Sequence, residues 1–183
     1  MKHFTARHPW AILAAGAAIQ ILTGLPAAWG VFQQPVMEEY GLSEQGAGYA
    51  FGILIAAFGV GCVLGGFLQD RHGPRCAGLW GTALLCGGFF AAGLLPPGSA
   101  AAFFLAFSIP AGLGTAFLYP SIQSCAQKWY AGRKGLATGV IGGAVGLSGA
   151  FLTVFVRTAV SGFGIVQGIR GAFWALGALT LPV

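Results

Sequence analysis

Long apolar runs separated by short polar connections make up most of the chain. Five runs reach the roughly 20 residues that a helix needs to cross the hydrocarbon core of a bilayer. They cover residues 10–32, 49–69, 76–95, 100–124 and 136–156, and the connections between them are 33–48, 70–75, 96–99 and 126–135. Short connections join antiparallel neighbours. The pattern therefore predicts an all-α membrane protein whose helices cross back and forth.

A sixth apolar run follows Arg157. A span over 159–182 places Arg170 near the bilayer centre, at a cost of about 2.5–3.5 kcal/mol on insertion scales. A partial helix over 171–183 avoids that cost, but it rises only about 20 Å through a hydrocarbon core that is about 30 Å thick. We prefer the second option and expect the chain to stop inside its sixth helix.

The composition supports a membrane protein. Only 7% of the 183 residues are charged and 56% are hydrophobic, whereas about a quarter of a soluble domain is charged. Two predicted helical faces carry almost only small residues. They are Gly135, Gly139, Gly142, Gly146 and Gly149 on one run, and Gly52, Ala56, Gly59 and Gly66 on another. Small residues let a second helix approach closely, so we expect these faces to pack helices together, and smooth faces also allow helices to slide.

The net charge of +5 is explained by topology, because the bases lie in the connections. With the N-terminus inside, the cytoplasmic bases are Lys2, Arg7, Arg71, Arg75 and the basic loop of Lys128, Arg133 and Lys134, against Arg157 and Arg170 outside. This bias follows the positive-inside rule. We expect a multi-pass protein of the plasma (inner) membrane with a cytoplasmic N-terminus, and the lipid bilayer rather than nucleic acid as its partner.

The connection 70–75 lies in the stretch GGFLQDRHGPR, residues 65–75. Asp70 falls at the end of a predicted helix, where the helix dipole disfavours a carboxylate. It therefore calls for a positive partner, either a nearby arginine or the N-terminus of another helix. Gly73 and Pro74 favour a tight reversal. A turn that only sets the topology, with incidental ion pairs, is the alternative.

Several stretches resemble a known family. Gly66, Asp70, Arg71, Gly73 and Arg75 match the cytoplasmic signature of the major facilitator superfamily position by position. The stretches GLPAAWGVF (24–32) and KWYAGRKGLATGVIGGAVG (128–146) resemble the oxalate/formate antiporter family within it. The resemblance implies a twelve-helix transporter of two six-helix halves with a central site and alternating access. This chain then corresponds to the N-terminal six-helix half with a truncated sixth helix, and the C-terminal half is absent.

The resemblance also implies roles for residues. The signature turn would act as a conformational latch, in which Asp70 meets a helix N-terminus of the other half. The resemblance gives Trp29 and Tyr119 as candidates for the substrate cavity. Gln20 and Gln123 are further candidates, because they are the main long polar side chains within the predicted spans. The family's aromatic positions hold Ala27 and Val145 here, which favours a larger or less compact anion. Packing of the two aromatic side chains, and hydrogen bonds from the two glutamines to neighbouring helices, are the alternatives.

The leading hypothesis is secondary active transport of a small organic anion, a carboxylate, by the full-length protein. The first alternative is a transporter of a monocarboxylate or another small metabolite. The second is a small membrane bundle that transports nothing and needs a partner subunit. An enzyme is not expected, because the sequence offers no nucleophile–base pair and no phosphate-binding loop. No metal site and no cofactor are expected either.

Overall fold

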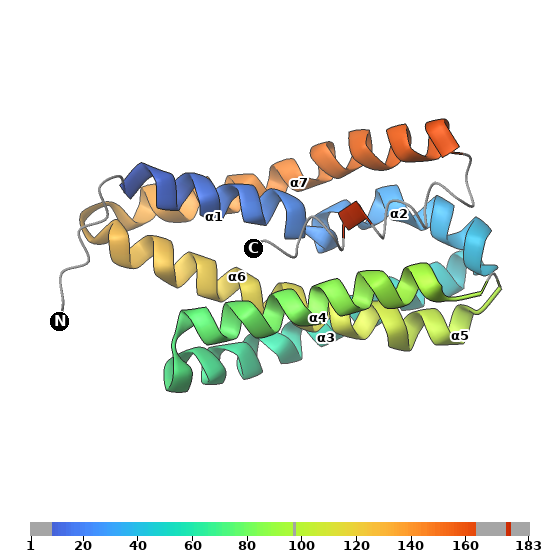
Figure 1. Ribbon diagram of the computed structural model, residues 1–183, viewed down its shortest axis with the longest axis horizontal. Helices are drawn as coiled ribbons and strands as arrows, with labels where there is room; N and C mark the ends of the chain where they lie inside the picture. The colour runs from blue at the N-terminus through green and yellow to red at the C-terminus, as the bar shows by residue number, and fades with distance from the viewer. Residues whose placement is uncertain (1–8, 97, 164–174, 177–183) are drawn as a thin grey trace.

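The computed structural model describes residues 9–96, 98–163 and 175–176. Within these residues the chain is helical, without strands, and its long helices lie side by side in one elongated bundle (Figure 1). The long helices are α1 Pro9–Thr23, α2 Leu25–Tyr40, α3 Glu44–His72, α4 Pro74–Leu94, α6 Ile109–Trp129 and α7 Lys134–Phe163. The short ones are α5 Ala100–Phe103, the π-helical turn Phe104–Ser108 and the 3₁₀ turn Ala131–Arg133.

Five helical stretches of the described chain are long and apolar enough to cross a membrane, as predicted. They are Trp10–Tyr40, Glu44–His72, Pro74–Leu94, Ala100–Trp129 and Ala131–Phe155. The predicted partial sixth helix, 171–183, lies outside the described residues except for Ala175 and Leu176.

Large apolar side chains cover the outside of the bundle. A water-soluble bundle would bury such side chains, whereas lipid solvates them. Those that are more than half exposed include Tyr49, Val60, Val63, Leu64, Phe67, Leu79, Trp80, Leu94, Leu105, Leu147 and Val154. The outer surface is therefore suited to a bilayer.

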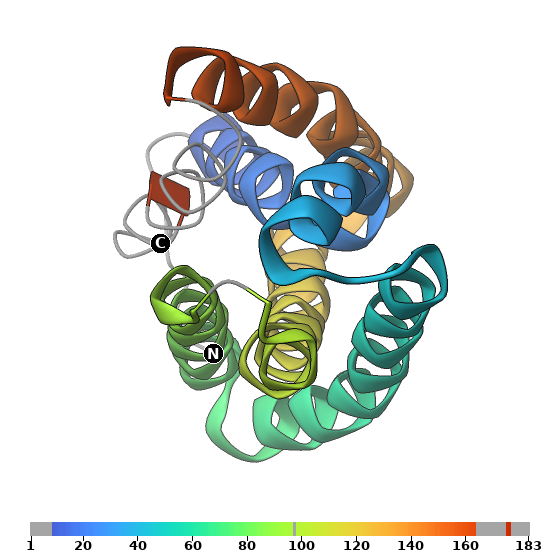
Figure 2. The same ribbon diagram turned by 90° about the vertical axis from the view of Figure 1, so that its right-hand side faces the viewer.

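The bundle has two distinct ends. At the end on the left of Figure 1, α1, α4 and α7 begin and α3 and α6 end. This end carries Arg71, Arg75, Lys128, Arg133 and Lys134, and we call it the basic end. The opposite end, which faces the viewer in Figure 2, holds an aromatic core in which Tyr40 and Phe103 have ring centroids 4.7 Å apart.

The first predicted helix, 10–32, is broken in the structure. α1 stops at Thr23, and α2 starts after Gly24 with a proline in its first turn. Because Pro26 has no N–H to donate to the carbonyl of Leu22, the helical hydrogen bonding is interrupted there. The predicted span over 10–32 therefore lies within a stretch that is long enough to cross a membrane, but two helices build it instead of one.

The predicted connection 33–48 is wrong in extent. α2 continues to Tyr40, and α3 already begins at Glu44, capped by the Ser43 hydroxyl, which accepts a bond of 3.1 Å from the Gly46 N–H. Phe32, Val36 and Tyr40 are all buried at 1% exposure or less. Their four-residue spacing keeps this half-polar stretch helical.

Two further predicted helices differ in shape. The run 100–124 contains a π-helical turn that ends two residues before Pro110, and its helix extends to Trp129. A proline ring excludes the carbonyl four residues earlier, which favours a wider local turn. The run 136–156 is longer than predicted, because α7 covers Lys134–Phe163.

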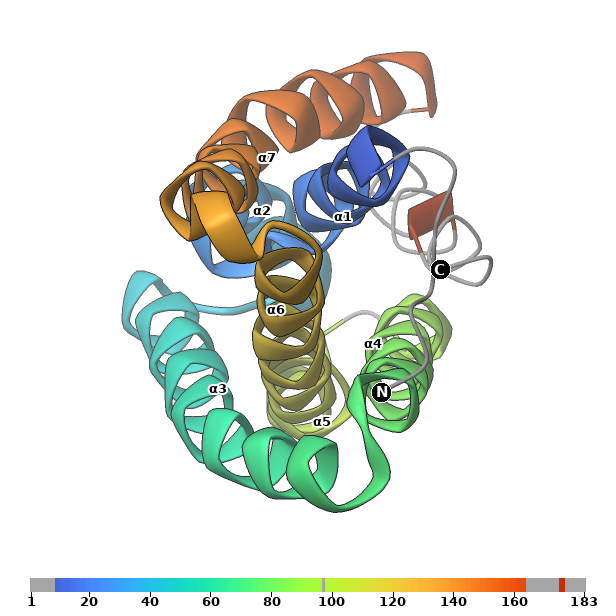
Figure 3. The ribbon, with the colours of Figure 1, turned by 90° about the vertical axis from the view of Figure 1, so that its left-hand side faces the viewer.

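α6 lies at the centre of the bundle, with α3 and α4 on one side and α1 and α7 on the other (Figure 3). Close approach is possible because glycines face each other. A Cβ added to Gly81 on α4 would lie 2.9 Å from the carbonyl oxygen of Gly114 on α6. Gly61 and Gly65 of α3 also lie close to α6, beside Leu113 and Phe117, although no glycine faces them there.

Candidate functional site

A cavity of about 310 Å³ lies between α1, α3, α6 and α7, and we call it the central cavity. Four segments supply its lining residues: Gln20 of α1 and Gly24 directly after it, Ile55 and Phe58 of α3, Thr115 and Tyr119 of α6, and Val145 of α7. The polar side chains come from α1 and α6, and the walls from α3 and α7 are apolar. The described lining contains no charged residue.

Gln20 is the most buried polar side chain of this lining, with an exposed fraction of 1%. Its Oε1 accepts a hydrogen bond of 3.3 Å from the Thr23 hydroxyl. Its Nε2 has no hydrogen-bond partner among the described residues. A buried unpaired donor costs about 1–3 kcal/mol, so an acceptor inside the cavity would stabilise this arrangement.

The break between α1 and α2 lies next to the cavity, and hydroxyl groups from two other helices face it. The Ser148 hydroxyl of α7 donates to the Gly24 carbonyl at 3.0 Å. The Thr115 hydroxyl of α6 lies 3.5 Å from the Thr23 carbonyl oxygen. Sequence reasoning missed Thr23, Thr115 and Ser148, and the available signal was Pro26, two residues after Gly24 inside an apolar run.

The predicted cavity residues separate into two groups. Gln20 and Tyr119 line the central cavity together, and Val145, the position that departs from the aromatic pattern, lines it as well. Trp29 is 6% exposed and stacks on Phe51 of α3 with ring centroids 6.0 Å apart, so it packs inside the bundle. Gln123 is half-buried and is not part of the cavity lining.

The signature turn forms the connection between α3 and α4. Gly73 has φ +87°, a value that favours glycine, and its N–H donates to the Gln69 carbonyl at 2.8 Å. Gly66 precedes it on α3 and has no neighbour within 4 Å of an added Cβ. Asp70 and Arg71 are exposed. In the described part of the chain, Asp70 forms no ion pair.

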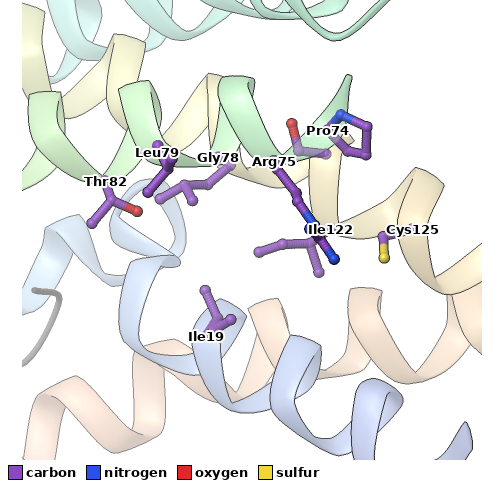
Figure 4. A pocket seen from close by; sticks show the side chains of 10 residues that line it. Ile19, Pro74, Arg75, Gly78, Leu79, Thr82, Ile122 and Cys125 are labelled. Atoms are coloured by element: carbon purple, nitrogen blue, oxygen red, sulfur yellow. The ribbon is translucent and has the colours of Figure 1, made fainter. Parts of the chain in front are cut away.

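Arg75 lines a second pocket of about 340 Å³ at the basic end, between α1, α4 and α6. Figure 4 shows its side chain beside Ile122, with Ile19 across the pocket and Cys125 nearby. Arg75 therefore extends into this pocket, although the sequence suggested it as a local partner for Asp70.

The basic loop between α6 and α7 is exposed at Lys128, Arg133 and Lys134. Its two sides are joined by a hydrogen bond of 3.0 Å from the Gln127 amide to the Thr138 hydroxyl. The described residues contain no cluster of His, Cys, Asp or Glu that could hold a metal ion.

The small-residue faces have no close neighbour in the part of the chain that the structure describes. Among the described residues, nothing lies within 4 Å of a Cβ added to Gly135, Gly139, Gly142 or Gly146, nor of one added to Gly52, Gly59 or Gly66. Gly149 is half-buried and Ala56 is exposed. A stripe of small residues permits a close approach without specifying which helix makes it, so the prediction that these faces pack helices together stays a prediction. We call them the open faces of α3 and α7.

The chain resembles known proteins over most of its length. It is 30% identical over 172 residues to an uncharacterized 38 kDa protein in a 23S RNA operon of Thermoproteus tenax, covering 93% of this chain and 43% of that protein. It is 23% identical over 159 residues to the oxalate:formate antiporter of Oxalobacter formigenes, covering 87% and 36%. It is 37% identical over 121 residues to a probable nitrate/nitrite transporter of Mycobacterium tuberculosis, covering 61% and 28%.

The chain thus spans less than half the length of these curated relatives. Two of these three relatives are named as transporters, which indicates a membrane transporter rather than an enzyme. Their names state different substrates, so they indicate no common substrate class. The sequence model of the family described as Major Facilitator Superfamily matches residues 11–183. That match includes the five apolar stretches except Trp10, the signature turn and the central cavity, and it shows that the chain belongs to the Major Facilitator Superfamily.

Proposed function

We propose that residues 1–183 form the N-terminal half of a secondary active transporter that moves a small organic anion by alternating access. The chain supplies the first six-helix half of a twelve-helix protein, including the partial helix 171–183. The N-terminus lies in the cytoplasm, and the protein resides in the plasma (inner) membrane. The oxalate/formate antiporter family is the branch of the superfamily that the signature stretches resemble.

The position of the central cavity relative to the open faces carries this proposal. Ile55 lines the cavity and follows Gly52 by three residues, and Val145 follows Gly142 by three. Three residues correspond to about 60° around a helix. The cavity is therefore bordered by the two faces that a second set of helices could cover. A second half packed on both faces would complete the site, and the greater length of the relatives supports this.

An anionic substrate requires that second half. The cavity lining described here offers hydrogen-bond donors but no positive charge, and a carboxylate without a cation is costly to bury. The resemblance implies that the cations lie in the C-terminal half. This half then supplies neutral donors and shape, and the missing half supplies the charge.

A monocarboxylate is the second candidate. The walls formed by Ile55, Phe58 and Val145 are apolar, whereas Gln20, Thr115 and Tyr119 are polar. A ligand with one carboxylate and an apolar body matches this division better than a compact dicarboxylate does.

Counterflow in proteoliposomes tests the function. The complete gene product that contains residues 1–183 is reconstituted, and uptake of radiolabelled oxalate, formate and benzoate is measured with each unlabelled anion inside. Saturable uptake of at least one carboxylate, dependent on the internal anion or on a proton gradient, is expected. Uptake of a cation or a neutral sugar, with no carboxylate transported, would overturn the proposal.

The reading frame provides a separate test of the missing half. Six further apolar helices with Arg or Lys embedded in them should follow residue 183. A frame that ends there, together with a purified chain that binds a partner subunit and transports nothing, would favour the non-transporting bundle instead.

A further inference from the structure

We propose that Gln20 recognises an oxygen atom of the transported anion through its amide N–H, and that Thr23 is the residue that positions it. This inference rests on the proposed function and assigns a specificity-determining pair within the central cavity. Thr23 does not line the cavity, so its role is to act through Gln20.

The first step concerns the free end of the amide. Gln20 is almost completely buried, it lines the cavity, and its Nε2 has no partner among the described residues. An amide in a membrane interior is stabilised when both of its ends are paired. The acceptor must therefore come from the cavity, either as water or as a ligand oxygen.

The second step concerns the held end. The Thr23 hydroxyl lies 3.3 Å from Gln20 Oε1 and 2.9 Å from the Ile19 carbonyl oxygen. A hydroxyl has only one hydrogen to donate. When this hydrogen points to Gln20, the amide oxygen is held and the N–H₂ group faces the cavity. When it points to Ile19, the hydroxyl oxygen can accept from the amide, which then turns its own oxygen toward the cavity.

The third step follows from the charge of the ligand. An anion in the cavity repels an amide oxygen and attracts an N–H donor. Binding therefore selects the first arrangement, in which Thr23 donates to Gln20. A neutral acceptor ligand would also use the N–H, whereas a cation would select the amide oxygen.

The fourth step concerns the burial of Thr23. Its side chain is fully buried at the end of α1, next to the break at Gly24. The carbonyls of Thr23 and Gly24 are approached by hydroxyl groups of α6 and α7, at 3.5 Å and 3.0 Å. Both hydroxyls lie closer to a carbonyl of their own helix, Thr115 to Ala111 at 2.8 Å and Ser148 to Val145 at 2.6 Å. The break is therefore packed against two other helices, and Thr23 presents its hydroxyl from a fully buried position.

Kinetics of the complete gene product in proteoliposomes test this pair, with whichever of oxalate, formate or benzoate the wild type transports. Gln20→Ala should raise KM roughly 10- to 100-fold, which corresponds to losing one hydrogen bond to a charged group. Gln20→Glu should raise it further, since a carboxylate offers no N–H and repels the anion. Gln34→Ala, at an exposed position of α2, is the matched control and should leave KM unchanged.

The positioning role is tested by two variants at one site. Thr23→Val keeps the shape but removes the hydroxyl, and it should raise KM with little change in the thermal stability of the purified protein. Thr23→Ser restores the hydroxyl and should return KM to near the wild-type value. Binding is also measured as the rise in melting temperature that the same anion produces, which needs only a folded protein.

The outcomes separate the inference from the proposed function. The inference would be overturned if the wild type transports a carboxylate and both Gln20→Ala and Thr23→Val have the same KM as Gln34→Ala. The proposed function would then remain intact. A wild type that transports no carboxylate contradicts the function itself. A Thr23→Ser variant as impaired as Thr23→Val would remove the positioning role.

Discussion

The contact between α4 and α6 allows a quantitative test of the packing. A Cβ added at Gly114 would lie 2.7 Å from the carbonyl oxygen of Gly81 and 2.7 Å from the amide nitrogen of Leu85. Both atoms belong to backbone, so no side chain can move aside. Carbon–oxygen contacts are tolerated at about 3.3–3.6 Å. Gly114→Ala therefore has to separate the two helices by about 0.6–0.9 Å.

Gly142 on the open face of α7 is the matched control. An added Cβ there meets nothing within 4 Å in the described chain. Overpacking of a well-packed core costs about 1–3 kcal/mol, whereas alanine in place of an exposed helical glycine gains up to about 1 kcal/mol. We expect Gly114→Ala to lower the free energy of unfolding by about 1–3 kcal/mol, and Gly142→Ala to leave it equal or raise it.

Unfolding of residues 1–183 in mixed micelles, followed by tryptophan fluorescence as the SDS fraction rises, measures both values. The reasoning is refuted if Gly114→Ala is as stable as the wild type, or if Gly142→Ala loses as much stability as Gly114→Ala does. The second result would mean that α7 packs through its open face inside this bundle.

Three further predictions concern single polar groups. Asp70→Asn should lower the transport rate of the complete gene product more than it lowers the level of expression. Glu44→Gln on the same helix is the control, and uptake by Asp70→Asn at the wild-type rate would exclude a latch. Tyr40→Phe removes the bond of 2.7 Å to the Ala92 carbonyl and should cost about 1 kcal/mol in the micelle assay, so an unchanged midpoint would contradict that bond. Ser43→Ala removes the cap of α3 and should also cost about 1 kcal/mol; Ser43→Asp should restore the stability, and a failure to do so would point away from capping.

The number of stretches that could cross a membrane, and their helical class, could be predicted because hydrophobic length is a local property of the sequence. The ends of the helices could not. At residues 33–40 the chain is half polar, yet it remains helical because Phe32, Val36 and Tyr40 contact an aromatic core built by distant segments. The break at Gly24 is local in origin, and Pro26 could have indicated it.

The candidate site was predicted in part. Long polar side chains in apolar runs are rare, so Gln20 was identifiable from sequence, and Tyr119 followed from the resemblance. Trp29 carried the same signal as Tyr119, but it stacks on Phe51 inside the bundle. Which side of a helix faces a cavity depends on how all the helices are arranged, and a membrane helix with apolar residues on every side does not reveal it.

The open face of α3 leads directly to Asp70. Asp70 follows Gly66 by one turn and Gly52 by 18 residues, which is five full turns of a helix. A helix of the proposed second half that covers the glycines would therefore reach Asp70 with one of its ends, and an N-terminus there would favour the carboxylate by about 0.3–1 kcal/mol or more when partly buried. If a single helix makes both contacts, Gly59→Leu and Asp70→Asn disrupt one interface. Their effects on the transport rate should then be less than additive in the double variant, as is usual for residues that share a partner. Fully additive losses would mean that the glycine face and the carboxylate serve different partners.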